Sequence, residues 1–186
     1  MKHSLVFIAF LLMLNLSNCV GQKDTTTTTN KVYESCCGVE PVEFTFGDAY
    51  MFVPNVFTPN GDGINDYFVP AVNDDVLAFD AYLIYTAVGD TLLFDRNGFS
   101  YQNIPSWAWD GNRKDGSPYI GPFKYEFVVF LKNNIIYTVK GSACRVACGP
   151  DASVFKGKTT CFYPIQADTS GRLNKSFPSQ ELDCFK

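Results

Sequence analysis

The stretch from residue 53 to residue 68, VPNVFTPNGDGINDYF, constrains the fold more than any other part of the chain. It begins as an apolar run that is typical of a β-strand. Pro59 should end that strand, because proline cannot donate a hydrogen bond to a neighbouring strand. Gly61 and Gly63 allow positive φ angles, and the asparagines and aspartates around them tolerate such angles better than most residues do. The sequence therefore predicts a strand followed by a tight polar loop whose side-chain oxygens point inward.

Two interpretations of this loop are open. Calcium binds about six to eight oxygen atoms from carboxylates, amides and backbone carbonyls. The loop could supply four such side chains and one carbonyl, those of Asn60, Asp62, Asn65, Asp66 and, for the carbonyl, Ile64. It lacks the bidentate glutamate and the flanking helices of an EF-hand. In the other interpretation the same side chains accept hydrogen bonds from the loop's own N–H groups, as a network of Asx-turns.

The run Pro-Asn-Val-Phe-Thr-Pro-Asn-Gly-Asp-Gly-Ile-Asn-Asp at residues 54–66 also carries a family resemblance. It resembles the opening motif of the gliding motility-associated C-terminal domain, also called the type B sorting domain of the type IX secretion system. A weaker resemblance continues to about Val146, with Trp109-Asp110-Gly111, then Gly121 with Tyr125, then Gly141 in the family's order. The resemblance implies an immunoglobulin-like β-sandwich on a protein exported by a bacterium that has this secretion system.

The chain departs from the family at two places. Residues 84–89 read Ile-Tyr-Thr-Ala-Val-Gly where the family has Ile-Phe-Asn-Arg-Trp-Gly, so the Arg-Trp pair is missing. The family domain normally ends its protein after a strand that closes in arginine. Here Cys144-Arg145-Val146-Ala147-Cys148 stands at that place, and the sequence continues to Lys186. The resemblance therefore favours the fold and the exported context over a role as a sorting signal.

The N-terminus has the pattern of a signal peptide over residues 1–21, with a basic start at Lys2 and an apolar run at residues 4–16. That run is too short to cross a bilayer core of about 30 Å comfortably. Leu16-Ser17-Asn18-Cys19 resembles a lipobox, which would make Cys19 the lipidated N-terminus of the mature chain. The alternative is ordinary cleavage after Gly21. Residues 22–31 include five consecutive threonines and indicate a flexible tether, because they cannot bury a core.

Export places the cysteines in an oxidising compartment, where disulfides persist. Six cysteines remain if Cys19 is lipidated or removed: Cys36, Cys37, Cys144, Cys148, Cys161 and Cys184. A zinc site is less favoured, because there is no second short-spaced cysteine pair and no nearby histidine. The adjacent Cys36 and Cys37 are each expected to have a distant partner. At least one of them should join the region after Gly141 and tie the C-terminal segment to the rest of the protein.

The remaining pattern predicts an all-β fold, an immunoglobulin-like antiparallel β-sandwich over residues 32–146. Strands are expected at residues 42–46, 50–57, 123–131 and 135–139, and as a pair around Gly89-Asp90 within residues 76–94. Residues 147–186 should form an irregular extension that carries cysteines and is stapled by disulfides. Trp109 is expected in the core, and Trp107 is expected on the opposite face, toward solvent.

Composition excludes several functions. The only histidine is His3, within the signal-like segment, so Ser-His-Asp and Cys-His catalysis and histidine-ligated metal sites are not expected. The chain carries 19 acidic against 15 basic residues, which disfavours nucleic acid as a partner. We expect a non-enzymatic module of the cell envelope, a surface or outer-membrane lipoprotein anchored through Cys19. Its role would be structural or would be to bind an envelope protein or glycan. The alternatives are a type IX sorting signal and, less favoured, a secreted hydrolase.

Overall fold

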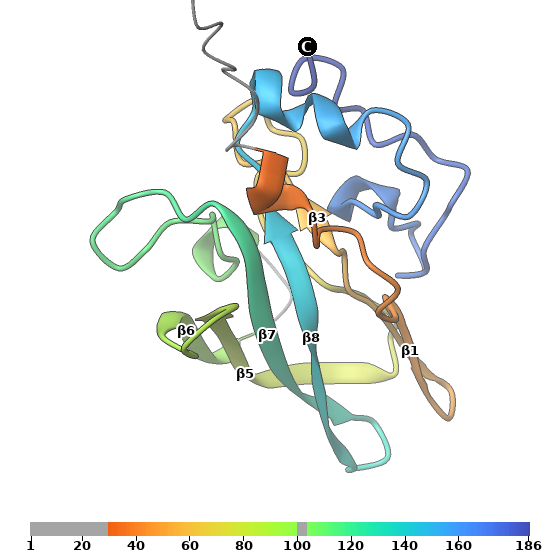
Figure 1. Ribbon diagram of the computed structural model, residues 1–186. Helices are drawn as coiled ribbons and strands as arrows, with labels where there is room; N and C mark the ends of the chain where they lie inside the picture. Colours follow the sequence, from red (N-terminus) through yellow and green to blue (C-terminus); the bar gives the residue numbers. More distant parts are fainter. Residues whose placement is uncertain (1–29, 100–103) are drawn as a thin grey trace, which may run out of the picture.

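The computed structural model describes residues 30–99 and 104–186 (Figure 1). The signal-like segment, Cys19 and most of the threonine-rich tether lie outside the described residues. Within the described part of the chain, no helix is long and apolar enough to cross a membrane. The lipid anchor at Cys19 therefore stays a prediction from the sequence.

The fold is mostly β and consists of two sheets packed face to face, as expected. The larger sheet has the order β3(Val56–Phe57), β8(Ile136–Arg145), β7(Gly121–Leu131), β5(Val76–Thr86) and β6(Leu92–Phe99). The smaller sheet has the order β1(Glu43–Phe46), β2(Ala49–Phe52) and β4(Ala71–Val72). Short 3-10 helices complete the described chain: η1(Asn30–Tyr33), η2(Ile104–Ser106), η3(Pro150–Phe155) and η4(Pro164–Gln166).

The long strands follow the alternation of their side chains. In β7 every second residue, from Phe123 to Leu131, is buried, whereas Lys124 and Glu126 lie on the other face. This period of two is that of a strand with one face on the core. The hairpin between β7 and β8 and the turn between β5 and β6 at Gly89-Asp90 are confirmed, the latter with positive φ at both residues.

Two expectations about the strands are wrong. Residues 50–57 do not form one strand, because the chain leaves the smaller sheet after β2 and enters the larger one at β3, on either side of Pro54. Proline lacks the N–H that a continuous central strand would need. The sandwich is also not wholly antiparallel, because β3 pairs in parallel with β8, with Val56 opposite Cys144 and Phe57 opposite Arg145.

Aromatic rings fill the space between the sheets. Phe57, Phe68 and Phe123 are fully buried and contact one another, and Trp109 packs on Phe57 and Phe123 as expected. The prediction that Trp107 turns outward is wrong, since it is 2% exposed and stacks on another ring of the core. The expectation misapplied the period of a strand, because residues two positions apart lie on the same face. Trp107 itself lies in the turn after η2.

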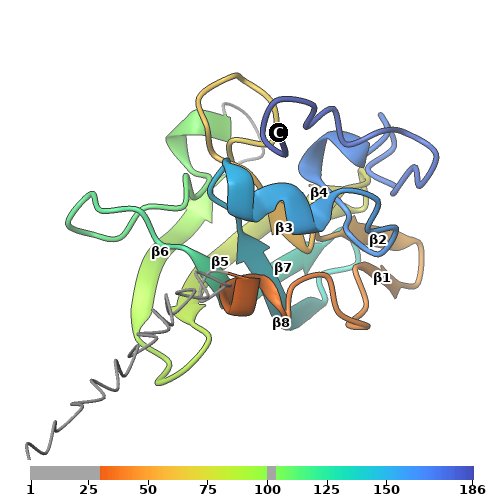
Figure 2. The ribbon, with the colours of Figure 1, turned by 45° about the horizontal axis from the view of Figure 1, so that its top comes forward.

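The extension formed by residues 147–186 covers the outer face of the smaller sheet (Figure 2). For this reason β2 is buried along its whole length. Met51 belongs to the core between the sheets, whereas Phe52 packs on the other face with Phe162 and Leu173 of the extension. The extension is irregular and has η3 and η4 as its helices, so it acts as a third layer of the same fold.

The described residues contain three disulfides: Cys36–Cys144 lies within residues 32–146, Cys37–Cys161 joins the extension to the sandwich, and Cys148–Cys184 closes the extension on itself. The adjacent cysteines each have a distant partner, and both partners follow Gly141, which confirms the expectation from the sequence. Of the fifteen pairings that six cysteines allow, spacing alone could not select this one.

The cross-strand pair of Tyr125 and Gly141 generates a prediction about stability. A Cβ atom at position 141 would collide with the hydroxyl and ring of the buried Tyr125 side chain. Gly141→Ala should therefore lower the free energy of unfolding by about 1–3 kcal/mol, the usual cost of overpacking, as measured by urea denaturation. Gly38→Ala is the matched control, because its added Cβ meets a neighbouring atom at an ordinary 3.8 Å. Equal stabilities of the two variants would contradict the prediction.

Candidate functional site

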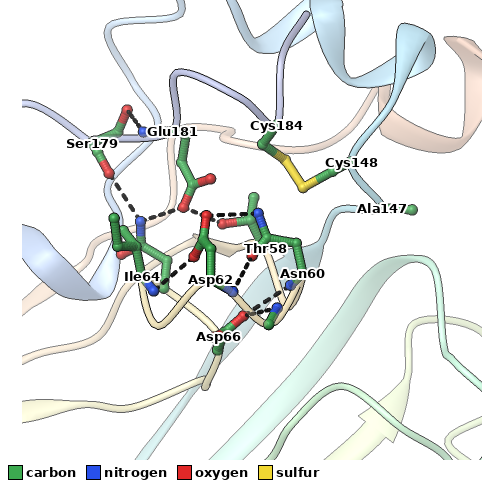
Figure 3. Close-up of a disulfide and its surroundings, with 12 residues drawn as sticks. Thr58, Asn60, Asp62, Ile64, Asp66, Ala147, Cys148, Ser179, Glu181 and Cys184 are labelled. Atoms are coloured by element: carbon green, nitrogen blue, oxygen red, sulfur yellow. Dashed lines mark hydrogen bonds between the residues drawn. A yellow bond between two sulfur atoms is a disulfide. The ribbon is translucent and has the colours of Figure 1, made fainter.

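The polar loop after β3 is organised around the carboxylate of Asp66 (Figure 3). Its Oδ1 accepts hydrogen bonds from the backbone N–H groups of Asn60 (2.8 Å) and Gly61 (2.7 Å). Its Oδ2 accepts one from Gly63 (2.8 Å). Gly61 and Gly63 have φ angles of 82° and 87°, a backbone conformation that other residues rarely adopt. These turns let three N–H groups converge on a single carboxylate.

Asp62 and Asn60 form two further Asx-turns in the same loop. Asp62 Oδ1 accepts the N–H of Ile64 (2.8 Å), and Asn60 Oδ1 accepts the N–H of Asp62 (3.0 Å). The side-chain amide of Asn60 donates to Asp62 Oδ2 (2.9 Å). Every side-chain oxygen of Asn60, Asp62 and Asp66 therefore accepts a hydrogen bond from the loop itself. Converging N–H dipoles repel a cation, so this arrangement supports the Asx-turn interpretation over calcium.

Asn65 turns away from the loop and toward the extension. It has a φ angle of 52° and is 6% exposed. Its amide Nδ2 donates to the carbonyl of Ser179 (2.9 Å) and to Oε1 of Glu181 (2.5 Å), and its Oδ1 accepts the N–H of Ile165 (2.9 Å). Both ends of the amide are thus bonded to the extension, and Asn65 does not join its neighbours as an oxygen ligand for a cation.

Asn55, just before β3, hydrogen-bonds to backbone groups of the extension, as a residue of a neighbouring strand would. Its Nδ2 donates to the carbonyl of Thr160 (2.9 Å), and its Oδ1 accepts the N–H of Phe162 (2.7 Å). Its backbone N–H donates to the carbonyl of Phe162 (3.1 Å). The side chain therefore satisfies backbone groups of the extension on both sides of Cys161, whose disulfide to Cys37 fixes the same segment.

A buried acid of the extension completes the contact. The hydroxyl of Thr58, which is fully buried, donates to Oε1 of Glu181 (2.5 Å), the same oxygen that Asn65 approaches. Glu181 is 2% exposed, and its other oxygen, Oε2, makes no hydrogen bond within the described residues. Burial raises the pKa of Glu181 above its ordinary value. The hydrogen bonds from Thr58 and Asn65 oppose that rise in pKa, and the negative charges of Asp62 and Asp66 add to it.

Glu181 lies beside a disulfide. One of its carboxylate oxygens and the sulfur atoms of Cys148 and Cys184 all lie within 4.8 Å of one another. In the described part of the chain, this is the one group of three acids, cysteines or histidines whose spacing would suit a metal ion. Both of its cysteines are bonded to each other, so their sulfurs are not free thiolate ligands in this form of the protein.

The outer face of the larger sheet carries a separate surface cavity. A hollow of about 450 Å³ lies over β5, β7 and β8 and is lined mainly by Tyr85, Lys124, Glu126, Lys140 and Ser142. Its lysines are held by neighbouring acids, Lys124 by Asp90 (2.8 Å) and Lys140 by Glu126 (2.9 Å). A second hollow of about 490 Å³ shares Lys124 and Ser142 with it. Volumes of this size are typical of ligand sites, so this face is the candidate binding surface.

The sequence predicts only part of this site. The loop residues are among the predicted ones, but Asn55, Thr58 and Glu181, which join the loop to the extension, are not. Glu181 stands in a segment with few apolar residues, and no local pattern distinguishes it from a solvated acid. The lining of the surface cavity was missed as well, because its residues come from three different strands.

A scan against protein-family models and a search of curated proteins find no match for this chain.

The geometry of the loop predicts its response to calcium. Asp66 accepts three backbone N–H groups whereas Asp62 accepts one, so Asp66→Ala should lower the melting temperature more than Asp62→Ala. The cost for Asp66 should be about 1–3 kcal/mol, because a carboxylate is the acceptor. Millimolar Ca²⁺ or a chelator should leave the melting temperature of the wild type unchanged. A rise with Ca²⁺ that Asp62→Ala abolishes would restore the calcium interpretation.

The raised pKa of Glu181 predicts a pH dependence of stability. The folded state retains this proton above the ordinary pKa of 4.5, at which the unfolded chain releases it. The stabilising contribution is therefore complete below that value and is lost as the pH rises through the folded pKa. The free energy of unfolding of the wild type should fall relative to that of Glu181→Gln across this window. Urea denaturation at a series of pH values measures this difference in the free energy of unfolding. Parallel pH profiles of the two proteins would contradict a raised pKa of Glu181.

Proposed function

We propose that this protein is an exported, non-enzymatic module of the cell envelope with an immunoglobulin-like sandwich, anchored to a membrane by a lipid on Cys19. Three disulfides are typical of a protein that folds in an oxidising compartment outside the cytoplasm, which supports the signal-like character of residues 1–21. The proposed role is structural or binding, and the proposed partner is an envelope protein or glycan.

The observation that carries this proposal is that residues of the sorting-like motif hydrogen-bond to the protein's own extension. Asn55, Thr58 and Asn65 all belong to the stretch that resembles a type B sorting domain, and all three direct their polar groups to the extension. The rest of the loop is bonded to itself through Asp66. A motif occupied in this way supports a structural role, because little of it is left to bind a secretion partner.

The binding role is supported by the two adjoining hollows on the outer face of the larger sheet. Lys124 and Ser142 line both hollows, and the exposed Val39 and Val88 also line the second one. Rings such as that of Tyr85 and charged side chains that are already ion-paired offer stacking and hydrogen bonds without a large net charge. These are contacts that suit an uncharged polymer such as a glycan.

The second candidate function is a type IX sorting signal, which the motif at residues 54–66 favours. A transport signal has to act from cargo to which it is attached. Here Cys144 stands at the end of β8 and Cys148 just after it, both in disulfides, and the chain continues into the extension. A secreted hydrolase is not proposed, because the histidine that such chemistry commonly uses is confined to the signal-like segment.

A fusion experiment separates these functions. Residues 32–186 are placed behind a periplasmic reporter in a cell that has the type IX machinery, and the reporter is assayed at the surface and in the medium. We expect the reporter to stay in the periplasm, because the motif is occupied by the extension.

The control is a type B sorting domain in the same position, which should carry the reporter out. A second arm compares the full chain with Cys19→Ala, which should leave the membrane fraction or fail to be processed. If the fusion is exported and its export requires the type IX machinery, the sorting-signal function is correct and the envelope-module function is wrong.

A further inference from the structure

The three disulfides differ in their exposure. Cys36 and Cys144 are 4% and 2% exposed, and Cys37 and Cys161 are 8% and 6% exposed, so both of these bridges are buried. In the third bridge Cys184 is 1% exposed, whereas Cys148 is an exposed residue at the surface of the extension. A thiol from solution or from another protein can therefore approach Cys148 more readily than the other five bridged cysteines. Exposure of this kind is characteristic of disulfides that exchange.

A buried acid lies on the inner side of this bridge. Glu181 reaches to within 4.8 Å of both sulfur atoms through one carboxylate oxygen. Its Oε1 is held by Thr58 and Asn65, and its Oε2 has no hydrogen bond within the described residues. Figure 3 shows the oxygen that lacks dashed lines on the side of the carboxylate that faces Cys184. Because only Oε1 is hydrogen-bonded, Oε2 remains available to donate a proton to a sulfur atom of the disulfide.

We propose that Cys148 and Cys184 form an exchangeable disulfide that reacts with an external dithiol, with Glu181 as the proton donor to Cys184. The exposed Cys148 is the sulfur that is attacked, and the buried Cys184 is the sulfur that leaves.

A thiolate of the external dithiol attacks Sγ of Cys148, a new S–S bond forms to it, and the Cys148–Cys184 bond breaks. Sγ of Cys184 leaves with the electron pair and takes the proton of Glu181. The second thiolate of the donor then attacks the donor sulfur that is bonded to Cys148. Cys148 leaves as a thiolate, which is protonated by water. The protein's disulfide is reduced by two electrons, and the donor's dithiol is oxidised to a disulfide.

The surroundings favour this role for Glu181. The titratable or charged groups that face it are Asp62 and Asp66 of the loop and Tyr163 of the extension. None of them is cationic, and burial raises the pKa of Glu181, so the carboxyl keeps its proton, which the departing thiolate can take, to a higher pH than an exposed glutamate does. Buried thiolate at Cys184 would otherwise lack compensation for its charge.

Opening the bridge would also affect the motif. Glu181 is three positions before Cys184, so release of Cys184 loosens the segment that bonds to Thr58 and Asn65. The N–H of Gly149 donates to the carbonyl of Cys184 (3.1 Å), which keeps the two cysteines close and favours re-formation. The Cys37–Cys161 bridge still ties the remainder of the extension to the sandwich.

The test is timed reduction of the native protein with dithiothreitol, followed by alkylation and mass mapping. Cys148–Cys184 should open first. Glu181→Gln, which keeps the size and the hydrogen bonds to Oε1, should slow that opening about tenfold or more, since a positioned proton donor contributes at least this much. Asp183→Asn is the matched control, because Asp183 is an exposed acid beside Cys184 that pairs with Lys186. Its rate should equal that of the wild type.

A pH profile distinguishes proton donation from a structural role. The wild-type rate per dithiothreitol thiolate should fall as Glu181 loses its proton, and the profile of Glu181→Gln should be flat. A melting curve checks that each variant is folded. Equal rates for the wild type and Glu181→Gln, matching pH profiles, or opening of a buried bridge first would each overturn the proposal.

Discussion

The parallel pairing of β3 with β8 is the interaction on which the rest of the structure depends. β3 has only two residues, and they face opposite sides. Phe57 belongs to the core between the sheets, and Val56 belongs to a second core formed with Tyr33, Phe155 and Phe185. Neither residue is exposed. Because alternate residues of a strand face opposite ways, this short pairing joins the sandwich to the extension at one point (Figures 1 and 2).

Around that pairing, polar side chains fix the position of the extension. Asn55, Thr58 and Asn65 are at most 6% exposed, and each hydrogen-bonds to the extension rather than to water. A buried polar group is costly unless it is bonded, so a shifted extension would leave several such groups unsatisfied. Apolar packing on β2 provides much of the contact, but it is less directional. The asparagines and the threonine select one register.

The sequence predicted the parts of the fold that obey local rules. The period of two in β7 and the Gly89-Asp90 turn were sufficient to place the long strands and their hairpins. The expectation for Trp107 was wrong because residues two positions apart in a strand share a face. A local rule failed at residues 50–57, where Pro54 divides one apolar run between two sheets. The loop was recognised, but the partners of Asn65 and the burial of Glu181 were not. These depend on contacts across more than one hundred positions of sequence, as the separation of 116 between Asn65 and Glu181 shows.

The positions of the disulfides relate this architecture to function. The buried Cys36–Cys144 bridge ties the N-terminal segment to the end of β8, and the buried Cys37–Cys161 bridge ties it to the segment that Asn55 holds. The second of these bridges secures the extension independently of its last residues. The third bridge closes the extension on itself, beside Glu181, the buried acid that bonds to the motif. A change of covalent state at Cys148 would therefore act on Glu181, Thr58 and Asn65 without detaching the extension. The Cys37–Cys161 bridge is thus a fixed attachment of the extension, whereas the contact of Glu181 with Thr58 and Asn65 is a local one that can open with the third bridge. This local contact lies on the stretch of residues 53–68, which constrains the fold most.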